Sequence, residues 1–185
     1  MLFRRARRSS EPPSAELLLE RLASPDAELR LRAVEAVDPH EPPEGAALER
    51  CSALVDDGDP RVRRSAIDLL GRLSVISGVV FEARVGAAIL ARVRDEVAPV
   101  RAEAAATLAL LLGGGDRDRR LGALRGLLED RDPGVRAEAA AALGDLEDRS
   151  ALSTLAYSMT ADPEPEVRFE CAFALANMKD RRARC

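Results

Sequence analysis

Five arginines recur at nearly constant spacing along this chain of 185 residues, and they are the first residues whose type and spacing suggest chemistry. They stand at positions 30, 63, 101, 136 and 168, which are 33, 38, 35 and 32 residues apart. A row of guanidinium groups is suited to binding phosphate. Four of the five also have an aspartate six residues earlier in the chain, so a structural role competes with phosphate binding.

The other residues that carry chemistry form no catalytic set. The single histidine, His40, lies between prolines with no nucleophile beside it, so we expect an exposed loop residue rather than a general base. Cys51, Cys171 and Cys185 are far apart, and no His/Cys set has zinc-ligand spacing. Residues 113–116, Gly-Gly-Gly-Asp, lack the Lys-Ser/Thr of a phosphate loop. We predict no catalytic residue, no cofactor and no metal.

The composition indicates a helical protein and excludes several other classes. Hydrophobic residues make up 46% of the chain and charged residues 32%, whereas aromatic residues make up only 3% and tryptophan is absent. A disordered chain would be less apolar, and a disulfide scaffold would have more than 3 cysteines. The odd and widely separated cysteines favour free thiols in a reducing compartment, so we expect a cytoplasmic protein.

The net charge of -4 is unevenly distributed. Residues 1–14 and residues 179–185 each carry +3, so residues 15–178 carry -10. We expect a basic flexible N-terminal arm, a central domain and a basic C-terminal tail with these bounds. An acidic domain is a poor match for nucleic acid, which needs a basic face. No stretch has the roughly 18 apolar residues of a membrane span, and no secretory signal follows the first arginines.

An internal repeat surrounds the five arginines. The segment Asp59–Arg63 is echoed by Asp132–Arg136 and Glu164–Arg168, and in a shorter form by Ala98–Arg101. A weaker copy ends at Arg30. Each copy contains or follows a proline, which suits the start of a helix because proline has no N–H to satisfy there. Five units of about 35 residues therefore fill the chain.

Each arginine opens a run of apolar residues at helical spacing. Counted from the apolar residue before the arginine as position zero, apolar or small residues recur at positions four, five and eight, which lie on one face of a helix. The predicted core sets are Leu29, Ala33, Val34 and Val37; Val62, Ala66, Ile67 and Leu70; Val100, Ala104, Ala105 and Leu108; Val135, Ala139, Ala140 and Leu143; and Val167, Cys171, Ala172 and Leu175.

A further apolar run at helical spacing precedes each of these helices, so every unit is predicted to be a helical hairpin. The first helices are expected at 15–23, 44–55, 79–94, 117–128 and 150–160. Prolines and glycines at 38–43 and 113–115 predict loops between units. The fold class is therefore all-α, an α-solenoid of about five stacked hairpins.

The repeated pattern of an aspartate, an apolar-Arg pair, and then alanine and leucine at helical spacing resembles the HEAT repeat, especially the short bacterial form found in phycobilin lyase subunits. The resemblance covers residues 15–178. It implies a ladder in which an aspartate in each turn bonds the arginine six residues later, and hence a structural role for the arginines. The implied pairs are Asp57 and Arg63, Asp95 and Arg101, Asp130 and Arg136, and Asp162 and Arg168.

The first unit departs from this pattern, because Ser24 stands six residues before Arg30. A serine can cap a helix but offers no full charge. A degenerate first repeat is expected at the end of a solenoid.

The second helices of such a solenoid are expected to line its concave face. Positions two and six of the five helices are Leu31 and Glu35, Arg64 and Asp68, Ala102 and Ala106, Ala137 and Ala141, and Phe169 and Phe173. Position three reads Arg32, Ser65, Glu103, Glu138 and Glu170. Alanines permit close approach and glutamates attract a positive partner, so this face is predicted to bind a basic or amphipathic helix of another protein.

Phe169 and Phe173 lie four residues apart on one helical face, away from the predicted core. Two exposed aromatics indicate a contact site, including self-association. Cover by the C-terminal tail, or a shifted register of the last unit, is an equally weighted alternative.

Three functions follow from these features. The first is a scaffold or adaptor without catalysis that binds a protein through the second helices. The second, implied by the resemblance, is a bilin lyase or chaperone-like enzyme subunit, although the chain has only 1 His, 1 Tyr and no Trp to contact a tetrapyrrole. The third is weak nucleic-acid binding, as in HEAT-like DNA glycosylases, which Glu103, Glu138 and Glu170 would oppose.

Overall fold

The chain folds into two layers of α-helices in the computed structural model, which describes residues 14–79, 83–111 and 117–180. The described residues contain no β-strand. The first helices of the five hairpins form one layer: α1 (Ala15–Leu22), α3 (Gly45–Ala53), α5 (Ala83–Arg92), α7 (Arg117–Leu127) and α9 (Leu152–Ala161). The second helices form the other: α2 (Ala27–Glu35), α4 (Pro60–Ile76), α6 (Ala98–Leu110), α8 (Pro133–Asp145) and α10 (Pro165–Asp180).

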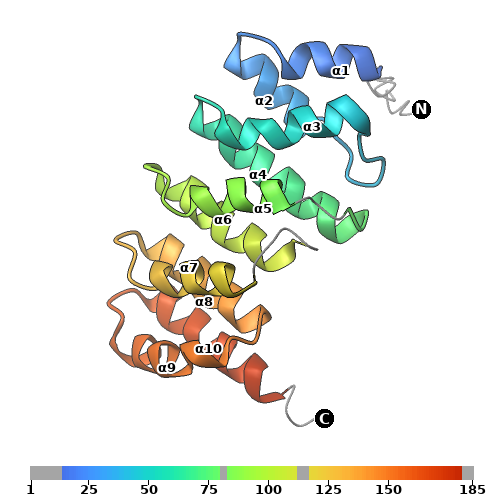
Figure 1. Cartoon of the computed structure of the whole chain (residues 1–185). Helices are drawn as coiled ribbons and strands as arrows, with labels where there is room; N and C mark the ends of the chain where they lie inside the picture. The colour runs from blue at the N-terminus through green and yellow to red at the C-terminus, as the bar shows by residue number, and fades with distance from the viewer. Residues whose placement is uncertain (1–13, 80–82, 112–116, 181–185) are drawn as a thin grey trace, which may run out of the picture.

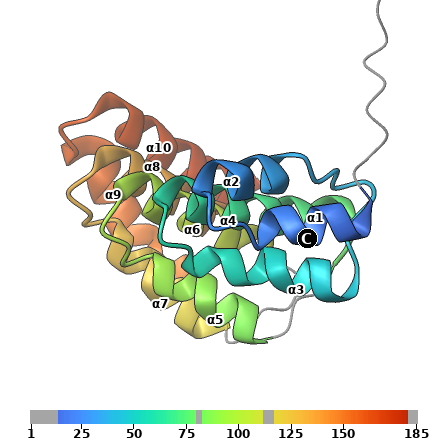
Figure 2. The same cartoon turned by 90° about the horizontal axis from the view of Figure 1, so that it is seen from above.

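The hairpins stack in chain order, as Figures 1 and 2 show from two directions. Each second helix packs on the first helix of its own hairpin, and α2, α4, α6 and α8 also pack on the second helix of the next hairpin. The predicted all-α solenoid of five hairpins is confirmed. Short 3₁₀ turns extend the first helices at two places, η1 (Leu54–Asp56) after α3 and η2 (Arg149–Ala151) before α9. Helix α5 begins later than expected, because Val79 lies in a non-helical segment.

Aspartates and prolines start the second helices. The Asp59 carboxylate accepts a hydrogen bond of 2.8 Å from the Arg61 amide, and Pro60 is the first helical residue. The Asp132 carboxylate caps α8 in the same way, at 3.3 Å from the Val135 amide. Such a cap satisfies an amide that has no partner inside the helix and contributes about 1 kcal/mol.

The core lies between the two layers and follows the predicted register in the three central hairpins. All twelve predicted core residues there, Val62 to Leu143, are at most 1% exposed. At the two ends the predicted register holds for Ala33, Val34, Val37, Val167 and Cys171, which are buried, but not for three other residues. Leu29, in the first hairpin, is 42% exposed. Ala172 and Leu175 are only half-buried because the structure shows no hairpin after α10.

Consecutive second helices approach most closely at small residues. A Cβ placed on Gly71 of α4 would lie 3.2 Å from the Thr107 hydroxyl of α6, and one placed on Gly144 of α8 would lie 2.7 Å from the Ala174 Cβ of α10. Gly71 and Gly144 both occupy position nine of their units, and Thr107 and Ala174 both occupy position seven. Position nine therefore faces the following hairpin and position seven faces the preceding one.

The single histidine and two of the three cysteines lie within the described residues. His40 is exposed in a turn, as expected. Cys51 and Cys171 are buried free thiols, and burial raises the pKa of each to about 11. Cys185, residues 113–116, and nearly all of the expected arm and tail lie outside the described residues. No helix within 14–79, 83–111 or 117–180 is long and apolar enough to cross a membrane.

Candidate functional site

An Arg–Asp ladder joins neighbouring hairpins along the edge where the turns inside the hairpins lie one above another (Figure 1). Arg30 donates from Nε and Nη2 to the Asp57 carboxylate at 2.7 and 2.8 Å. Arg101 binds Asp130, and Arg136 binds Asp162, with the same two-bond geometry at 2.7 to 2.8 Å. Arg63 makes one such bond, 2.8 Å from Nη2 to Asp95. Each carboxylate thus belongs to the hairpin that follows its arginine.

This pairing corrects the one expected within each unit. Within a unit, the arginine instead donates from Nη1 to the backbone carbonyl six residues earlier. These bonds are 2.8 to 2.9 Å long and run from Arg30 to Ser24, Arg63 to Asp57, Arg101 to Asp95, Arg136 to Asp130, and Arg168 to Asp162. Ser24 is therefore a full member of the first turn, because its backbone oxygen does what the aspartate carbonyls do elsewhere.

The ladder carboxylates are held in their charged form. Burial by itself would raise the pKa of Asp130, but the hydrogen bonds from Arg101 and from the Asp132 amide outweigh it and leave that pKa below its ordinary value. Asp57 and Asp95 have lowered pKa values by the same balance, and at Asp162 the bond from Arg136 is the largest influence. The paired guanidinium groups are committed to these carboxylates, which excludes a free arginine row for phosphate.

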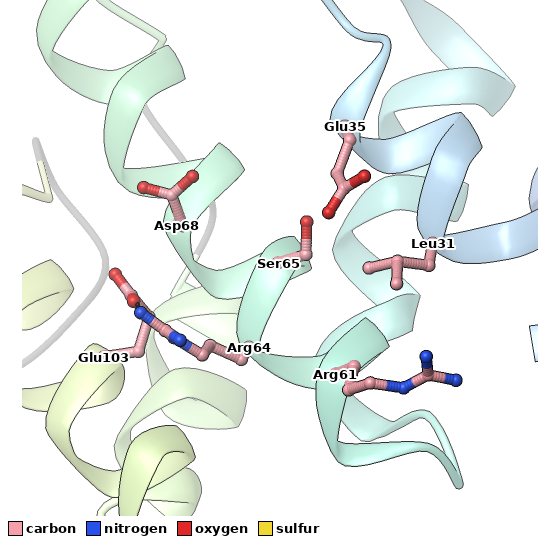
Figure 3. Close-up of a pocket in the computed structure, with 7 residues that line it drawn as sticks. All are labelled: Leu31, Glu35, Arg61, Arg64, Ser65, Asp68 and Glu103. Carbon is pink, nitrogen blue, oxygen red and sulfur yellow. Dashed lines mark hydrogen bonds and ion pairs between the residues drawn. The ribbon is translucent and has the colours of Figure 1, made fainter. Parts of the chain in front are cut away.

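Two hollows lie side by side on the exposed side of the second helices, the surface that we call the second-helix face. The first measures about 490 Å³ and lies between α2, α4 and α6 (Figure 3). Its lining residues are Leu31, Glu35, Arg61, Arg64, Ser65, Asp68 and Glu103. Arg64 reaches across it and donates to the Glu103 carboxylate at 3.2 Å, which joins α4 to α6.

The second hollow measures about 330 Å³ and lies between α6 and the start of α8. Ala98, Ala102 and Ala106 contribute apolar surface to it, while Glu103 and Glu138 contribute carboxylates. Arg64 and Glu103 also line the first hollow, so the two hollows form one surface.

Carboxylates crowd one another on this surface. Loss of solvent raises the pKa of Glu138, and the nearby charges of Glu103, Glu170 and Glu166 raise it further. Loss of solvent also raises the pKa of Glu103, although the hydrogen bond from Arg64 acts in the opposite direction. We call Glu103, Glu138 and Glu170 the acidic stripe. Within the residues that the structure describes, Glu138 and Glu170 have no basic group within 4 Å, so part of this negative charge is uncompensated.

The structure brings together only some of the predicted contact residues. Ala102, Glu103, Ala106 and Glu138 line the second hollow. Ala141 and Glu170 are half-buried and do not line it. Ala137 was expected on the open surface, but it is only 6% exposed and lies on the side of α8 that α10 covers. Ala137 therefore belongs to the packing between hairpins, and not to the exposed surface on which it was expected.

Phe169 and Phe173 lie apart from both hollows, on α10. They are 65% and 52% exposed, and their rings stack at 6.3 Å with an interplanar angle of 12°. The alternative of cover by the C-terminal tail falls on residues that lie mostly outside the described part of the chain, so it stays a prediction.

The sequence prediction gave too little weight to the first hollow. Glu35, Ser65 and Asp68 occupy positions six, three and six of their units, the same register positions as the central alanines and glutamates. This shared register could have predicted that these residues line a surface continuous with that of the central alanines and glutamates. Residues 14–79, 83–111 and 117–180 contain no group of three or more His, Cys, Asp or Glu side chains arranged to hold a metal ion.

Stacked helical hairpins with a repeated interhelical turn define the chain as an α-solenoid of the helical-repeat class. A sequence model described as HEAT repeats matches residues 15–109 and again residues 86–176. The chain therefore belongs to the HEAT repeat family. No curated protein matches the sequence.

Solved structures share the fold at low sequence identity. The complex of CpcE and CpcF of phycocyanin lyase from Nostoc sp. PCC7120 contains a chain with 20% identity and a TM-score of 0.73, over 99% of this chain and 71% of that one. A crystallised engineered protein has 22% identity and a TM-score of 0.63, over 90% and 79%. Human deoxyhypusine hydroxylase has 23% identity and a TM-score of 0.56, over 92% and 64%. At these identities the likeness concerns the fold.

Proposed function

We propose that the protein is a HEAT-repeat scaffold or adaptor without catalytic activity of its own, which binds a protein partner through the second-helix face. The observation that carries this proposal is the continuous double hollow, where alanine side chains lie beside the partly uncompensated acidic stripe. The partner that fits is a basic or amphipathic helix. Its apolar residues would contact the alanines, and its Lys or Arg residues would relieve the repulsion around Glu138.

One structural neighbour supports a role in protein assembly. CpcE is described in a complex with CpcF, so a chain of this fold works beside another protein there. The same neighbour also supports a second candidate, a bilin lyase or chaperone-like subunit. Tyr157 is 71% exposed and is the only tyrosine in the chain, which leaves little aromatic surface for a tetrapyrrole. A change in visible absorbance on mixing the protein with a free bilin would favour that second candidate over the scaffold.

Charge reversal tests the proposed site. The variant Glu138→Lys/Glu170→Lys changes two residues of the acidic stripe, and Glu16→Lys/Glu20→Lys makes the same change in charge on exposed residues of α1, in the other layer. Proteins retained from lysate by the wild type would be compared with those retained by each variant. We expect one partner to be lost with the stripe variant alone, and its affinity for the wild type to fall as salt rises. Equal retention by both variants would place the site elsewhere.

A further inference from the structure

Within the described residues, Arg168 is the last arginine of the Arg–Asp ladder, and it makes only the bonds inside its own turn. Arg168 donates from Nη1 to the Asp162 and Pro163 carbonyls at 2.8 and 2.9 Å, as the other ladder arginines do within their turns. In the four earlier units Nη2, and in three of them also Nε, binds a carboxylate of the following hairpin. Within the described part of the chain, no carboxylate oxygen lies within 4.0 Å of the Arg168 guanidinium.

In the described part of the chain, the apolar part of the stacking surface beside this arginine is also exposed. In α8, Ala137, Ala141 and Gly144 lie on the side that packs against α10, and Gly144 and Ala174 are in direct contact. The residues of α10 in the same register are Phe169, Phe173 and Ala176, and all three are exposed. The two stacked rings thus occupy the place where the earlier units receive the next hairpin.

The described end of α10 therefore repeats both components of the interface that α8 presents to α10. One component is a guanidinium group aimed at the turn of a following hairpin, and the other is an apolar strip along the second helix. In α8 that strip consists of the small residues Ala137, Ala141 and Gly144, whereas α4 has Arg64 and Asp68 at the first two of these register positions. Two large aromatic side chains provide more contact area, and such residues are enriched where separate proteins bind.

We propose that the C-terminal end of the solenoid is a second protein-binding surface, which receives a helical hairpin of another protein. The turn of that hairpin supplies an aspartate or glutamate carboxylate to Nε and Nη2 of Arg168, and its second helix lies across Phe169 and Phe173. This surface is separate from the two hollows of the second-helix face, and the proposal does not rest on the function assigned to them.

A second copy of this chain lacks the required group. The turn of its first hairpin has Ser24 at the ladder position, and the Ser24 hydroxyl already accepts a bond of 3.1 Å from the Asp26 amide. Stacked head to tail, it would offer Arg168 a neutral oxygen in place of a carboxylate. A hairpin of a different protein with an acidic turn meets the requirement.

The chain offers its own probe for this surface. A donor variant, Ser24→Asp/Arg168→Met, carries the missing carboxylate at its first turn and has lost its own ladder arginine at the other end. Mixed with the wild type, it is expected to form a one-to-one complex measurable by sedimentation velocity and titration calorimetry, whereas each protein alone stays monomeric. The donor is prepared with and without residues 1–13, so that these residues cannot mask the turn.

Three control mixtures separate the contributions of Arg168, of the two phenylalanines and of the introduced carboxylate to binding. Replacing wild type by an Arg168→Met acceptor is expected to weaken the complex about tenfold or more, because the buried carboxylate then has no guanidinium partner. A Phe169→Ser/Phe173→Ser acceptor is expected to weaken it by a similar factor. A Ser24→Asn/Arg168→Met donor tests the charge with the shape retained. The proposal is overturned if neither form of the donor binds the wild type, if the Arg168→Met acceptor binds equally well, or if the wild type alone self-associates as strongly.

Discussion

Gly144 of α8 and Ala174 of α10 touch so closely that a Cβ on the glycine would lie 2.7 Å from the alanine Cβ and 2.8 Å from its Cα. Backbone atoms form part of this contact, so the clash cannot be relieved by rotating a side chain. The separation of the last two hairpins is thus fixed by the absence of one methyl group.

Substituting this glycine should destabilise the protein although alanine is the better helix former. The gain in helix propensity is about 1 kcal/mol, but overpacking in a fixed core costs about 1 to 3 kcal/mol and requires the helices to move apart. We expect Gly144→Ala to lower the denaturant midpoint of unfolding. Gly122→Ala is the control, because Gly122 is exposed on α7 and its Cβ would meet only the end of Arg125 at 3.8 Å. That change should leave stability unchanged or raise it.

Breaking one bridge of the ladder should cost much more than breaking an exposed ion pair. Asp130→Ala leaves the Arg101 side chain, which is 6% exposed, without its carboxylate, and an uncompensated buried charge costs about 3 kcal/mol or more. Asp68→Ala breaks the exposed pair with Arg72 and should cost less than about 1 kcal/mol. Equal losses in urea unfolding of the two variants would contradict a structural role for the ladder.

Stability should respond to acid in two opposite ways. The pKa of Glu138 is higher in the folded protein than its ordinary value of 4.5, so the folded protein binds this proton more tightly than the unfolded chain does. Protonation of Glu138 therefore stabilises the fold as the pH falls from neutral toward 4.5. The pKa values of the ladder aspartates are lowered, so their contribution is present above 3.8 and is lost as pH falls below it. We therefore expect stability to rise slightly and then to fall. Glu138→Gln should raise stability at pH 7 and reduce the initial rise in a series of thermal melts.

Thiol reactivity should distinguish the folded from the unfolded chain at two cysteines. Cys51 and Cys171 are fully buried, and their pKa values of about 11 leave almost no thiolate near pH 8. Iodoacetamide should modify both residues only in denaturant, as peptide mapping by mass spectrometry would show. Rapid modification of either residue in the native protein would mean that its hairpin opens.

The repeat and its buried helix faces could be predicted from the sequence, but the contacts between neighbouring hairpins could not. Helical spacing predicts that Val62 and Ile67 are buried, because the register of one helix decides which face is apolar. It does not decide whether Arg63 pairs with Asp57 or Asp95, since both aspartates lie in turns on the same edge of the solenoid. Ala102 and Ala137 share a register position, yet only Ala137 is buried by the next helix. That difference depends on the distance between α8 and α10, which the contact of Gly144 with Ala174 sets. The apolar pattern of a single helix does not predict the distance to its neighbour.

The Arg–Asp bridges all lie along one edge of the molecule, at the turns inside the hairpins. Short charge-assisted bonds resist being stretched. The distance between neighbouring hairpins is therefore fixed along that edge. A change in the curvature of the solenoid would come from a change in the distance between hairpins along the opposite edge. A partner that lies along the second helices would then select one curvature without breaking any of the bridges.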